Sequence, residues 1–243
     1  LVVQPYYKKH GVRLEPEIIR TSDAVVANSL YLQDYSLQFN PKSYYVGQGC
    51  EVEMFDPTLV TPEPTDILNM KGPVIGYVGN LVSMRLDMQL IYSIAKQKPN
   101  CNIVLVGPED EDFRASELHQ LANVHFSGRK DPEELPAYVK RFDVCINPQA
   151  VNPLTIGNYP RKIDEYLAMG KPVIATRTKA MEFFADYTYL ASTPDEYVSH
   201  IQTALDEKNE AIAQQRIAFA RSHTWENSVE EIYKVVENLD RGK

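Results

Sequence analysis

The chain has 243 residues, of which 44% are hydrophobic and 24% are charged, and its formal net charge is −8 at pH 7. This composition excludes a disordered chain, because enough apolar surface is present to offset the entropy lost on folding. The acidic balance argues against a protein that wraps nucleic acid, which needs a basic face, but it allows a small local anion site.

The chain opens on Leu1-Val2-Val3 without a methionine, and we expect it to be part of a longer protein. We see no signal peptide and no apolar stretch near the ~18 residues of a membrane helix. Its three cysteines are widely spaced and form no CxxC pair. They predict buried free thiols in a reducing compartment rather than a zinc site or a disulfide framework.

Short runs rich in Val and Ile predict strands that are buried on both faces. They cover residues 24–27, 43–46, 74–78, 103–106, 124–126, 144–146, 173–175 and 187–190. Between them lie helix start signals, at Asp131-Pro132, at Pro160, in the capping box Thr193 to Glu196, and at Thr224. This alternation predicts an α/β fold, a Rossmann-like parallel sheet flanked by helices.

The proline-rich stretch around Pro57, Pro62 and Pro64 has the composition of a linker. We therefore divide the chain into a leading fragment (1–56), a linker (57–72), a main domain (73–222) and a C-terminal helix (223–243). The leading fragment, with an expected two strands and two helices, is too small to bury a core alone and should dock elsewhere.

Ligands of open α/β sheets bind at the carboxyl ends of the strands, where the strand order reverses. The loop after 74–78 contains Gly79, Asn80 and Arg85. Glycine allows backbone to approach a ligand, and arginine suits phosphate, although a plain turn with an exposed arginine is the alternative. The dinucleotide fingerprint GxGxxG is absent, so nothing here supports a nicotinamide enzyme.

The next two loops carry weaker signals. Asp110 and Asp112 form a D-x-D, which we interpret as acids at a helix start rather than as a metal site. Gly128 again permits close approach. Arg129 could face a base or a phosphate, or form a solvated basic pair with Lys130.

A long loop after 144–146 runs through Asn158 and Tyr159 into the helix 160–169. Lys162 and Glu165 share a face near the start of that helix. Amides of residues 159–162 and the Lys162 ammonium could hold a diphosphate, and Glu165 could accept both hydroxyls of a ribose. A local surface ion pair is the alternative. Together the loops point to a nucleotide-diphosphate sugar rather than to a dinucleotide.

Four stretches, in order and spacing, carry a family resemblance: GYVGNLVSMRLDMQLI, IVLVGPED, NVHFSGRKDPEELPAYVKRFDVCINP and PRKIDEYLAMGKPVIAT. They resemble the donor-binding, C-terminal domain of group-one retaining glycosyltransferases of the GT-B fold. The likeness runs from about residue 73 to 190 and more weakly through SHTWENSV. The leading SDAVVANSLYLQDYSLQ and GQGCEVEMF resemble the end of the acceptor domain and its link.

The resemblance implies transfer of a sugar from a nucleotide-diphosphate sugar to an acceptor hydroxyl, with retention, without a metal and without a cofactor. It implies an acceptor that is a saccharide or a lipid-linked saccharide, bound through the missing domain. It also implies a role in polysaccharide biosynthesis in the cytoplasm, at the inner face of a membrane. The isolated chain would transfer sugar poorly, since placing the acceptor is worth up to ~7 to 11 kcal/mol.

The resemblance also assigns roles to residues. Glu165 would hold the ribose, Lys162 and Arg85 would contact phosphate, and Gly79 with Asn80 would form the first glycine loop. The backbone near Gly128 and Arg129 would meet the base.

Two positions depart from the pattern. Many relatives have an acid eight positions before the ribose-binding one, where this chain has Gly157, and an arginine after the first glycine, where it has Asn80. The identity of the sugar stays open. No catalytic residue can be named, and the five histidines are expected to be structural or on the surface.

Two other functions stay open at this point. The chain could be a non-catalytic binding module, such as one half of a two-chain transferase whose partner covers an apolar face of residues 1–56. It could also be a sugar-nucleotide epimerase of the same architecture, although no acid/base cluster identifies one.

Overall fold

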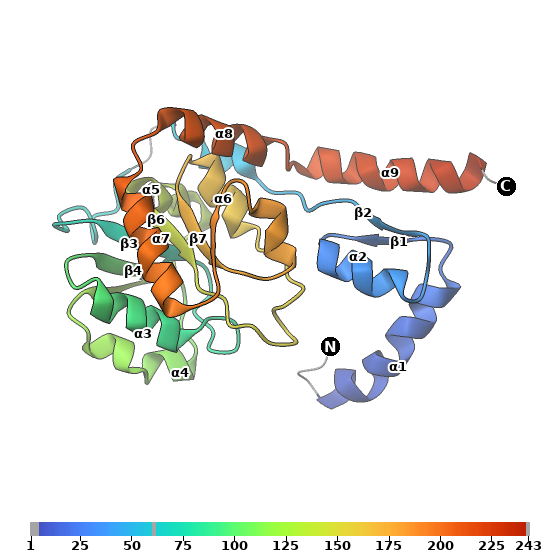
Figure 1. The fold of residues 1–243 in the computed structure, drawn as a ribbon, viewed down its shortest axis with the longest axis horizontal. Coiled ribbons are helices and arrows are strands. Elements are labelled where there is room, and N and C mark those ends of the chain that lie inside the picture. The colour runs from blue at the N-terminus through green and yellow to red at the C-terminus, as the bar shows by residue number, and fades with distance from the viewer. Residues whose placement is uncertain (1–4, 60–61, 242–243) are drawn as a thin grey trace.

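The computed structural model describes residues 5–59 and 62–241, and the side chains of 8–59 and 62–239. The opening Leu1-Val2-Val3, two linker residues (60–61) and the last two residues of the predicted C-terminal helix lie outside the described residues. Six parallel strands form the main sheet, in the order β5-β4-β3-β6-β7-β8 (Figure 1). They are β3 (Val74–Val78), β4 (Asn102–Val106), β5 (Val124–Gly128), β6 (Val144–Asn147), β7 (Val173–Thr176) and β8 (Tyr189–Ala191). The order reverses between β3 and β6, as in a Rossmann sheet.

Helices cover both faces of this sheet (Figure 1). The α-helices are α3 (Met88–Gln97), α4 (Glu111–Arg114), α5 (Leu135–Arg141), α6 (Lys162–Ala168), α7 (Pro194–Asp206) and α8 (Glu210–Arg221), and the 3-10 helices are η1 (Val52–Phe55), η2 (Glu117–Gln120), η3 (Pro132–Glu134) and η4 (Ala180–Phe184). The expected α/β class, a parallel Rossmann-like sheet flanked by helices, is confirmed.

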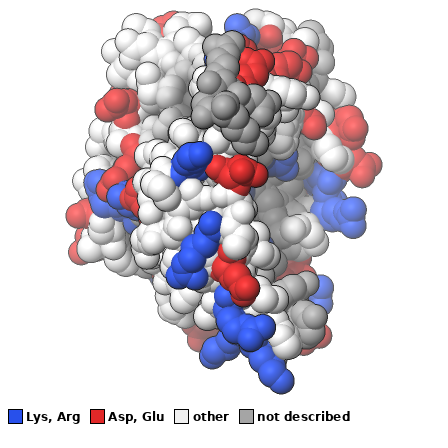
Figure 2. Space-filling view, turned by 90° about the vertical axis from the view of Figure 1, so that its right-hand side faces the viewer, with Lys and Arg blue, Asp and Glu red and all other residues white. Residues whose placement is uncertain are grey.

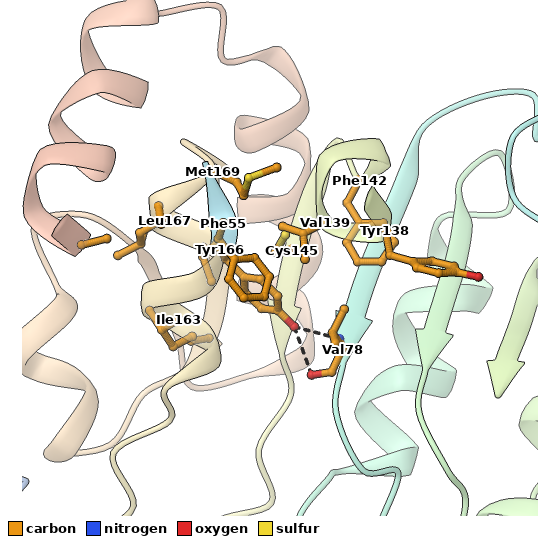
Figure 3. Close-up of a cluster of buried hydrophobic side chains, with 14 of the residues drawn as sticks. Phe55, Val78, Tyr138, Val139, Phe142, Cys145, Ile163, Tyr166, Leu167 and Met169 are labelled. Atoms are coloured by element: carbon orange, nitrogen blue, oxygen red, sulfur yellow. Dashed lines mark hydrogen bonds between the residues drawn. The ribbon is translucent and has the colours of Figure 1, made fainter. Parts of the chain in front are cut away.

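The core has two halves because strand side chains alternate between the faces of the sheet. Val74 and Val78 of β3 pack on one face, in a cluster with residues of α5, α6 and α8 (Figure 3). Ile75 and Tyr77 pack on the other face, in a cluster with residues of α3 and α7. All five residues of β3 are buried, which explains the continuous apolar run in the sequence.

The leading residues form a smaller unit beside this domain (Figure 1). It consists of α1 (Pro5–Thr21), β1 (Val25–Ala27), α2 (Leu30–Leu37) and β2 (Ser43–Tyr45), with β1 and β2 paired in parallel. The last helix, α9 (Trp225–Arg241), returns toward it. Gly49 is packed so closely on Trp225 that a Cβ there would lie 2.4 Å from the indole ring. The two predicted strands and two predicted helices of the leading fragment are therefore present.

An apolar groove of about 710 Å³ runs between the leading unit and α9. Its lining includes Leu14, Ile18, Trp225, Val229 and Ile232, all of them at least partly exposed. Figure 2 shows this end of the molecule, where described side chains of both charge signs are scattered over a largely uncharged surface. The apolar face that the sequence predicted on residues 1–56 is thus present, next to apolar residues of α9.

The predicted strands all exist, within two residues of their expected bounds. One helix begins later than predicted: α6 starts at Lys162 rather than at Pro160. The Ile163 amide donates to the Pro160 carbonyl at 2.9 Å, so the first turn closes over three residues and the α-helical pattern follows it.

The three cysteines, Cys50, Cys101 and Cys145, are free and buried, as predicted. In the described part of the chain, no helix is both long and apolar enough to cross a membrane.

Candidate functional site

A cavity of about 480 Å³ opens at the carboxyl ends of β3 and β6, where the strand order reverses. Seven of the nine predicted site residues line it, namely Gly79, Asn80, Arg85, Asn158, Tyr159, Lys162 and Glu165. The loop after β3, the loop after β6 and the first turns of α6 contribute them. The sequence therefore predicted the place of this cavity and seven of its sixteen lining residues.

The hydroxyl of Tyr166 fixes α6 against the end of β3. It accepts a hydrogen bond from the Val78 amide at 2.8 Å and donates to the Val78 carbonyl at 3.4 Å (Figure 3). Tyr166 is fully buried, so water does not compete for these bonds. Because Gly79 follows Val78 and Glu165 precedes Tyr166, this contact holds the two sides of the cavity together.

Lys162 lies over the glycine loop after β3. Its Nζ is 4.8 Å from the centroid of the Tyr77 ring, and a Cβ on Gly79 would lie 3.3 Å from that Nζ. An ammonium over a glycine backbone leaves room for a small anion to approach both groups. The neighbouring Arg161 also lines the cavity.

Close packing of the strand-end loops depends on a second glycine, Gly107. A Cβ at Gly107 would lie 1.9 Å from the Gly79 carbonyl oxygen, and its φ of +147° disfavours other residues. The Gly107 amide donates to the Gly128 carbonyl at 2.9 Å. The glycines that end β3, β4 and β5 are thus linked along one edge of the sheet.

Gly128 and Arg129 do not line the cavity. They lie at the end of β5, two strands away from β3, and Arg129 is exposed. Leu135, at the start of α5, is the residue from this side that reaches the lining. The expected contact of Gly128 and Arg129 with a base stays a prediction.

The D-x-D has a structural role. Asp110 caps α4 by accepting from the Phe113 amide at 2.9 Å, and it also accepts from the Ser83 amide at 2.7 Å. Asp112 accepts from the Ser83 hydroxyl at 2.7 Å. Burial raises the pKa of the Asp110 carboxyl, but these hydrogen bonds outweigh it and the pKa is lowered. The two acids therefore hold the loop that carries Arg85.

Among the described residues, no three His, Cys, Asp or Glu side chains gather as a metal site would require.

Arg85 is exposed at the rim of the cavity. Its backbone carbonyl accepts from the Ala150 amide at 2.9 Å, which joins the two loops of the rim.

Glu165 is half-buried in the cavity wall. Burial raises the pKa of its carboxyl above the ordinary value, and the positive charges of Lys162 and Arg161 oppose this shift. Its neighbour Asp164 is fully buried and points elsewhere, accepting a hydrogen bond from the Tyr159 hydroxyl at 2.7 Å. Glu165 is left as the one carboxylate among the described lining residues.

Gly157, where the family resemblance implies an acid, lies outside the cavity lining. Its carbonyl accepts from the Ser29 hydroxyl at 2.8 Å, and a Cβ there would lie 2.7 Å from the Tyr31 ring. An acidic side chain at this position would clash with α2, so the loop after β6 supplies other groups to the cavity.

Sequence reasoning missed several polar lining residues, namely Asn147, Gln149, Thr155 and Arg161. Asn147 carried a signal, because it ends the otherwise apolar run of β6 with a polar side chain. Gln149 and Thr155 carried no such signal in the sequence. They reach the cavity because the loop after β6 folds back on itself, where the Gln149 side-chain nitrogen donates to the Thr155 carbonyl at 2.9 Å.

The histidines are placed as expected. His119 pairs with Glu109 at 2.7 Å, and His125 lies 3.1 Å from the Asn102 side chain. His200 packs near the Tyr189 ring, and His223 pairs with Asp164 at 2.8 Å. No histidine is among the described residues that line the cavity.

Comparison with known proteins gives the family. The model of the family described as "Glycosyl transferases group 1" matches residues 72–207, more than half of the chain. The chain belongs to the group 1 glycosyl transferases. The matched span contains every predicted site residue.

A curated relative from Bacillus subtilis (strain 168), named as a teichuronic acid biosynthesis glycosyltransferase, TuaH, is 30% identical over 231 residues. The match covers 90% of this chain and 58% of that protein. The chain thus spans a little over half the length of this curated relative.

Solved glycosyltransferases share the fold. The crystal structure of Anabaena HepE in complex with UDP and glucose matches with a TM-score of 0.75 and 19% identity, over 99% of this chain and 69% of that one. Sucrose-phosphate synthase from Thermosynechococcus elongatus matches with a TM-score of 0.73 and 19% identity, over 100% of this chain and 65% of that one. These likenesses confirm the fold class expected from the sequence.

Proposed function

We propose that the chain binds a nucleotide-diphosphate sugar in the cavity at the ends of β3 and β6. The whole protein then transfers the sugar to an acceptor hydroxyl, with retention and without a metal. The observation that carries this proposal is the convergence of Arg85, Lys162 and Glu165 on one cavity at the reversal of the strand order. In the sequence, Arg85 and Glu165 are 80 positions apart, and the fold brings them to one site.

The cations suit the chemistry of such a transfer. When the bond between the sugar and the diphosphate breaks, negative charge grows on the leaving phosphate oxygens. Lys162 is held over Gly79 by its contact with the Tyr77 ring, so its charge is in place before the reaction. Preorganised positive charge of this kind lowers the barrier, because no reorganisation is needed when the bond breaks.

Glu165 suits a ribose. An ionised carboxylate offers two acceptor oxygens, which match two adjacent hydroxyls. Lys162 and Arg161 favour the ionised form of the half-buried Glu165. The same side chain would select a ribonucleotide over a deoxyribonucleotide, which lacks one of the two hydroxyls.

The composition of the cavity favours transfer over epimerisation. An epimerase needs an acid and a base beside the sugar. The described lining holds one carboxylate, Glu165, and no histidine or cysteine. Lysine and tyrosine can also move protons, but Lys162 lies over the Tyr77 ring and the Tyr159 hydroxyl donates to the buried Asp164 at 2.7 Å. The other polar side chains of the lining are amides, arginines and a threonine hydroxyl, which suit sugar and phosphate oxygens.

The acceptor and the location are further proposals. TuaH is named for teichuronic acid biosynthesis, and we propose a saccharide or lipid-linked saccharide as acceptor. We place the reaction in the cytoplasm, at the inner face of a membrane, a location that the three free thiols suit. The apolar groove beside α9 also fits the alternative that a second chain completes the transferase.

Calorimetric titration of the chain with UDP and UDP-glucose tests donor binding. HepE has been crystallised with both, so they are the first probes. We expect binding in the wild type and a loss of about 10- to 100-fold in affinity in Lys162→Ala and Glu165→Gln, because each removes a hydrogen bond to a charged group.

Matched controls are available on the exposed surface of α9. Lys234→Ala and Glu230→Gln remove a lysine and a glutamate that form an ion pair with each other on α9, outside the cavity lining. They should bind like the wild type. Unchanged affinity in both cavity variants would refute the assignment of donor binding to Lys162 and Glu165. Product analysis with a labelled donor would then show whether the protein catalyses transfer, hydrolysis or epimer formation.

A further inference from the structure

The leading unit lies behind one wall of the candidate cavity. Residues 158–161, which connect the loop after β6 to α6, form this wall. Gly157, the residue before them, lies outside the lining and packs against α2. The leading unit can therefore hold the wall in place without touching a ligand itself.

Ser29 joins α2 to this loop. Its side-chain oxygen caps α2 by accepting from the Leu32 amide at 3.2 Å, and its hydroxyl donates to the Gly157 carbonyl at 2.8 Å. Ser29 is 1% exposed, so water does not compete for either bond. Because a serine hydroxyl accepts and donates at the same time, one side chain fixes both the start of α2 and the loop.

The other side of this contact has room for a glycine. A Cβ at Gly157 would lie 2.7 Å from Cδ1 of Tyr31 and 3.4 Å from Cδ2 of Leu32. The first distance is too short for a real contact in a close-packed interior. A larger residue at 157 would therefore push the loop and α2 apart.

Two further contacts reach the same wall from the leading part of the chain. The ring centroid of Tyr45, in β2, is 5.6 Å from that of Phe183, which is 6.1 Å from that of Tyr159 in the wall. Sγ of Cys50 lies 3.9 Å from the carbonyl oxygen of Arg161, at the end of the wall. The wall is thus supported from behind along its length.

The wall carries groups that a donor would meet. It supplies Asn158, Tyr159 and Arg161 to the cavity and leads directly into Lys162 and Glu165. Such groups bind well only when their backbone is held in the productive geometry. The loop that carries them, residues 148–161, is irregular, so its position depends on contacts from outside the loop.

We propose that Ser29 is a positioning residue for donor binding: its hydrogen bond to Gly157 holds the wall 158–161 in the geometry that accepts the nucleotide sugar. This inference rests on the proposed donor function. Ser29 lies outside the family-matched residues 72–207. The donor cavity therefore depends on a residue of the leading unit.

The donor affinity of Ser29→Ala tests the proposal. In calorimetric titrations of the full chain, the dissociation constant for UDP should rise about 3- to 10-fold, because the hydrogen bond to Gly157 is lost. The variant also loses the cap of α2, which should lower its melting temperature. Asn209→Ala is the matched control, since it removes the N-cap of α8 outside the cavity lining. It should lower the melting temperature and leave the affinity for UDP unchanged.

A second test changes the contact from the side of the loop. Gly157→Ala should weaken UDP binding by a similar factor, because its methyl group meets the Tyr31 ring. Removing that ring as well should relieve the clash, so the double variant Tyr31→Ala/Gly157→Ala should bind UDP as well as Tyr31→Ala alone. A direct contact between residue 157 and the ligand would give no such rescue.

Three results would overturn the proposal. The first is an unchanged affinity for UDP in Ser29→Ala. The second is an equal loss of affinity in Asn209→Ala, which would trace the effect to general stability. The third is a double variant that binds UDP no better than Gly157→Ala. If the wild-type chain binds neither UDP nor UDP-glucose, the donor function itself fails and this inference fails with it, a result distinct from these three.

Discussion

The Nδ1 atom of His223 lies 2.8 Å from Oδ1 of Asp164, a carboxylate with no exposed surface. The other carboxylate oxygen accepts from the Tyr159 hydroxyl, and the His223 carbonyl accepts from the Cys50 amide at 2.9 Å. The Asp164–His223 pair therefore joins the cavity loop, α6 and the segment before α9 directly beside Glu165.

This pair should contribute to stability as a unit. We expect Asp164→Ala and His223→Ala each to lower the free energy of unfolding by about 2 to 4 kcal/mol, since each leaves a buried polar partner alone. The double variant should lose about 1 to 3 kcal/mol less than the two single losses combined. Urea unfolding of the four proteins measures this coupling, and strictly additive losses would show that the pair does not interact.

A second buried pair predicts sensitivity to acid. Arg216 is 2% exposed, and its guanidinium forms two hydrogen bonds with the Glu207 carboxylate, which also accepts from the Tyr189 hydroxyl at 2.7 Å. Burial raises the pKa of Glu207, but the hydrogen bonds and the charge of Arg216 outweigh it, and the pKa lies below the ordinary 4.5. A lowered pKa contributes stability that is present above pH 4.5 and is lost as the pH falls through the folded-state value.

The variant Glu207→Gln tests this sign. At pH 7 its melting temperature should lie well below that of the wild type, because Arg216 loses its charged partner. Between pH 5 and pH 3 the gap should narrow, as the wild type protonates Glu207. A gap that stays constant down to pH 3 would contradict the lowered pKa.

Glu165 predicts a pH dependence of donor binding. Its pKa is raised mainly by burial, so it takes up a proton at a higher pH than an ordinary glutamate. A protonated carboxyl offers fewer acceptor sites for the ribose hydroxyls. The affinity for UDP-glucose, whose esterified diphosphate does not titrate in this range, should therefore fall as the pH decreases, beginning above pH 4.5, in calorimetric titrations from pH 8 to pH 5. Glu165→Gln should bind weakly with little dependence on pH, and an equally steep dependence in this variant would assign the titration to another group.

The sequence predicts those features that are local. The unbroken apolar run of β3 marks a strand buried on both faces, and the three-residue spacing of Lys162 and Glu165 places both at the start of α6. The general rule for ligand sites in parallel sheets then puts these residues at the reversal of the strand order. Hence the fold class and seven residues of the cavity lining were predictable.

The remaining features depend on contacts between distant parts of the chain. The Tyr166 hydroxyl meets Val78, 88 positions away, and His223 meets Asp164, 59 positions away. Similarly, Gly157 leaves the cavity because Tyr31 packs against it. No local pattern encodes such pairings.

A crystal structure of the chain with UDP tests the central claim most directly. The account predicts the diphosphate between Lys162, Arg85 and the Gly79 backbone, with both ribose hydroxyls on Glu165. A larger cavity of about 1130 Å³ lies elsewhere, and its lining holds both basic residues (Lys98, Arg141, Lys171, Lys208) and acidic ones (Asp143, Asp206, Glu207, Glu210). Nucleotide bound there, with the cavity at the ends of β3 and β6 unoccupied, would contradict the account.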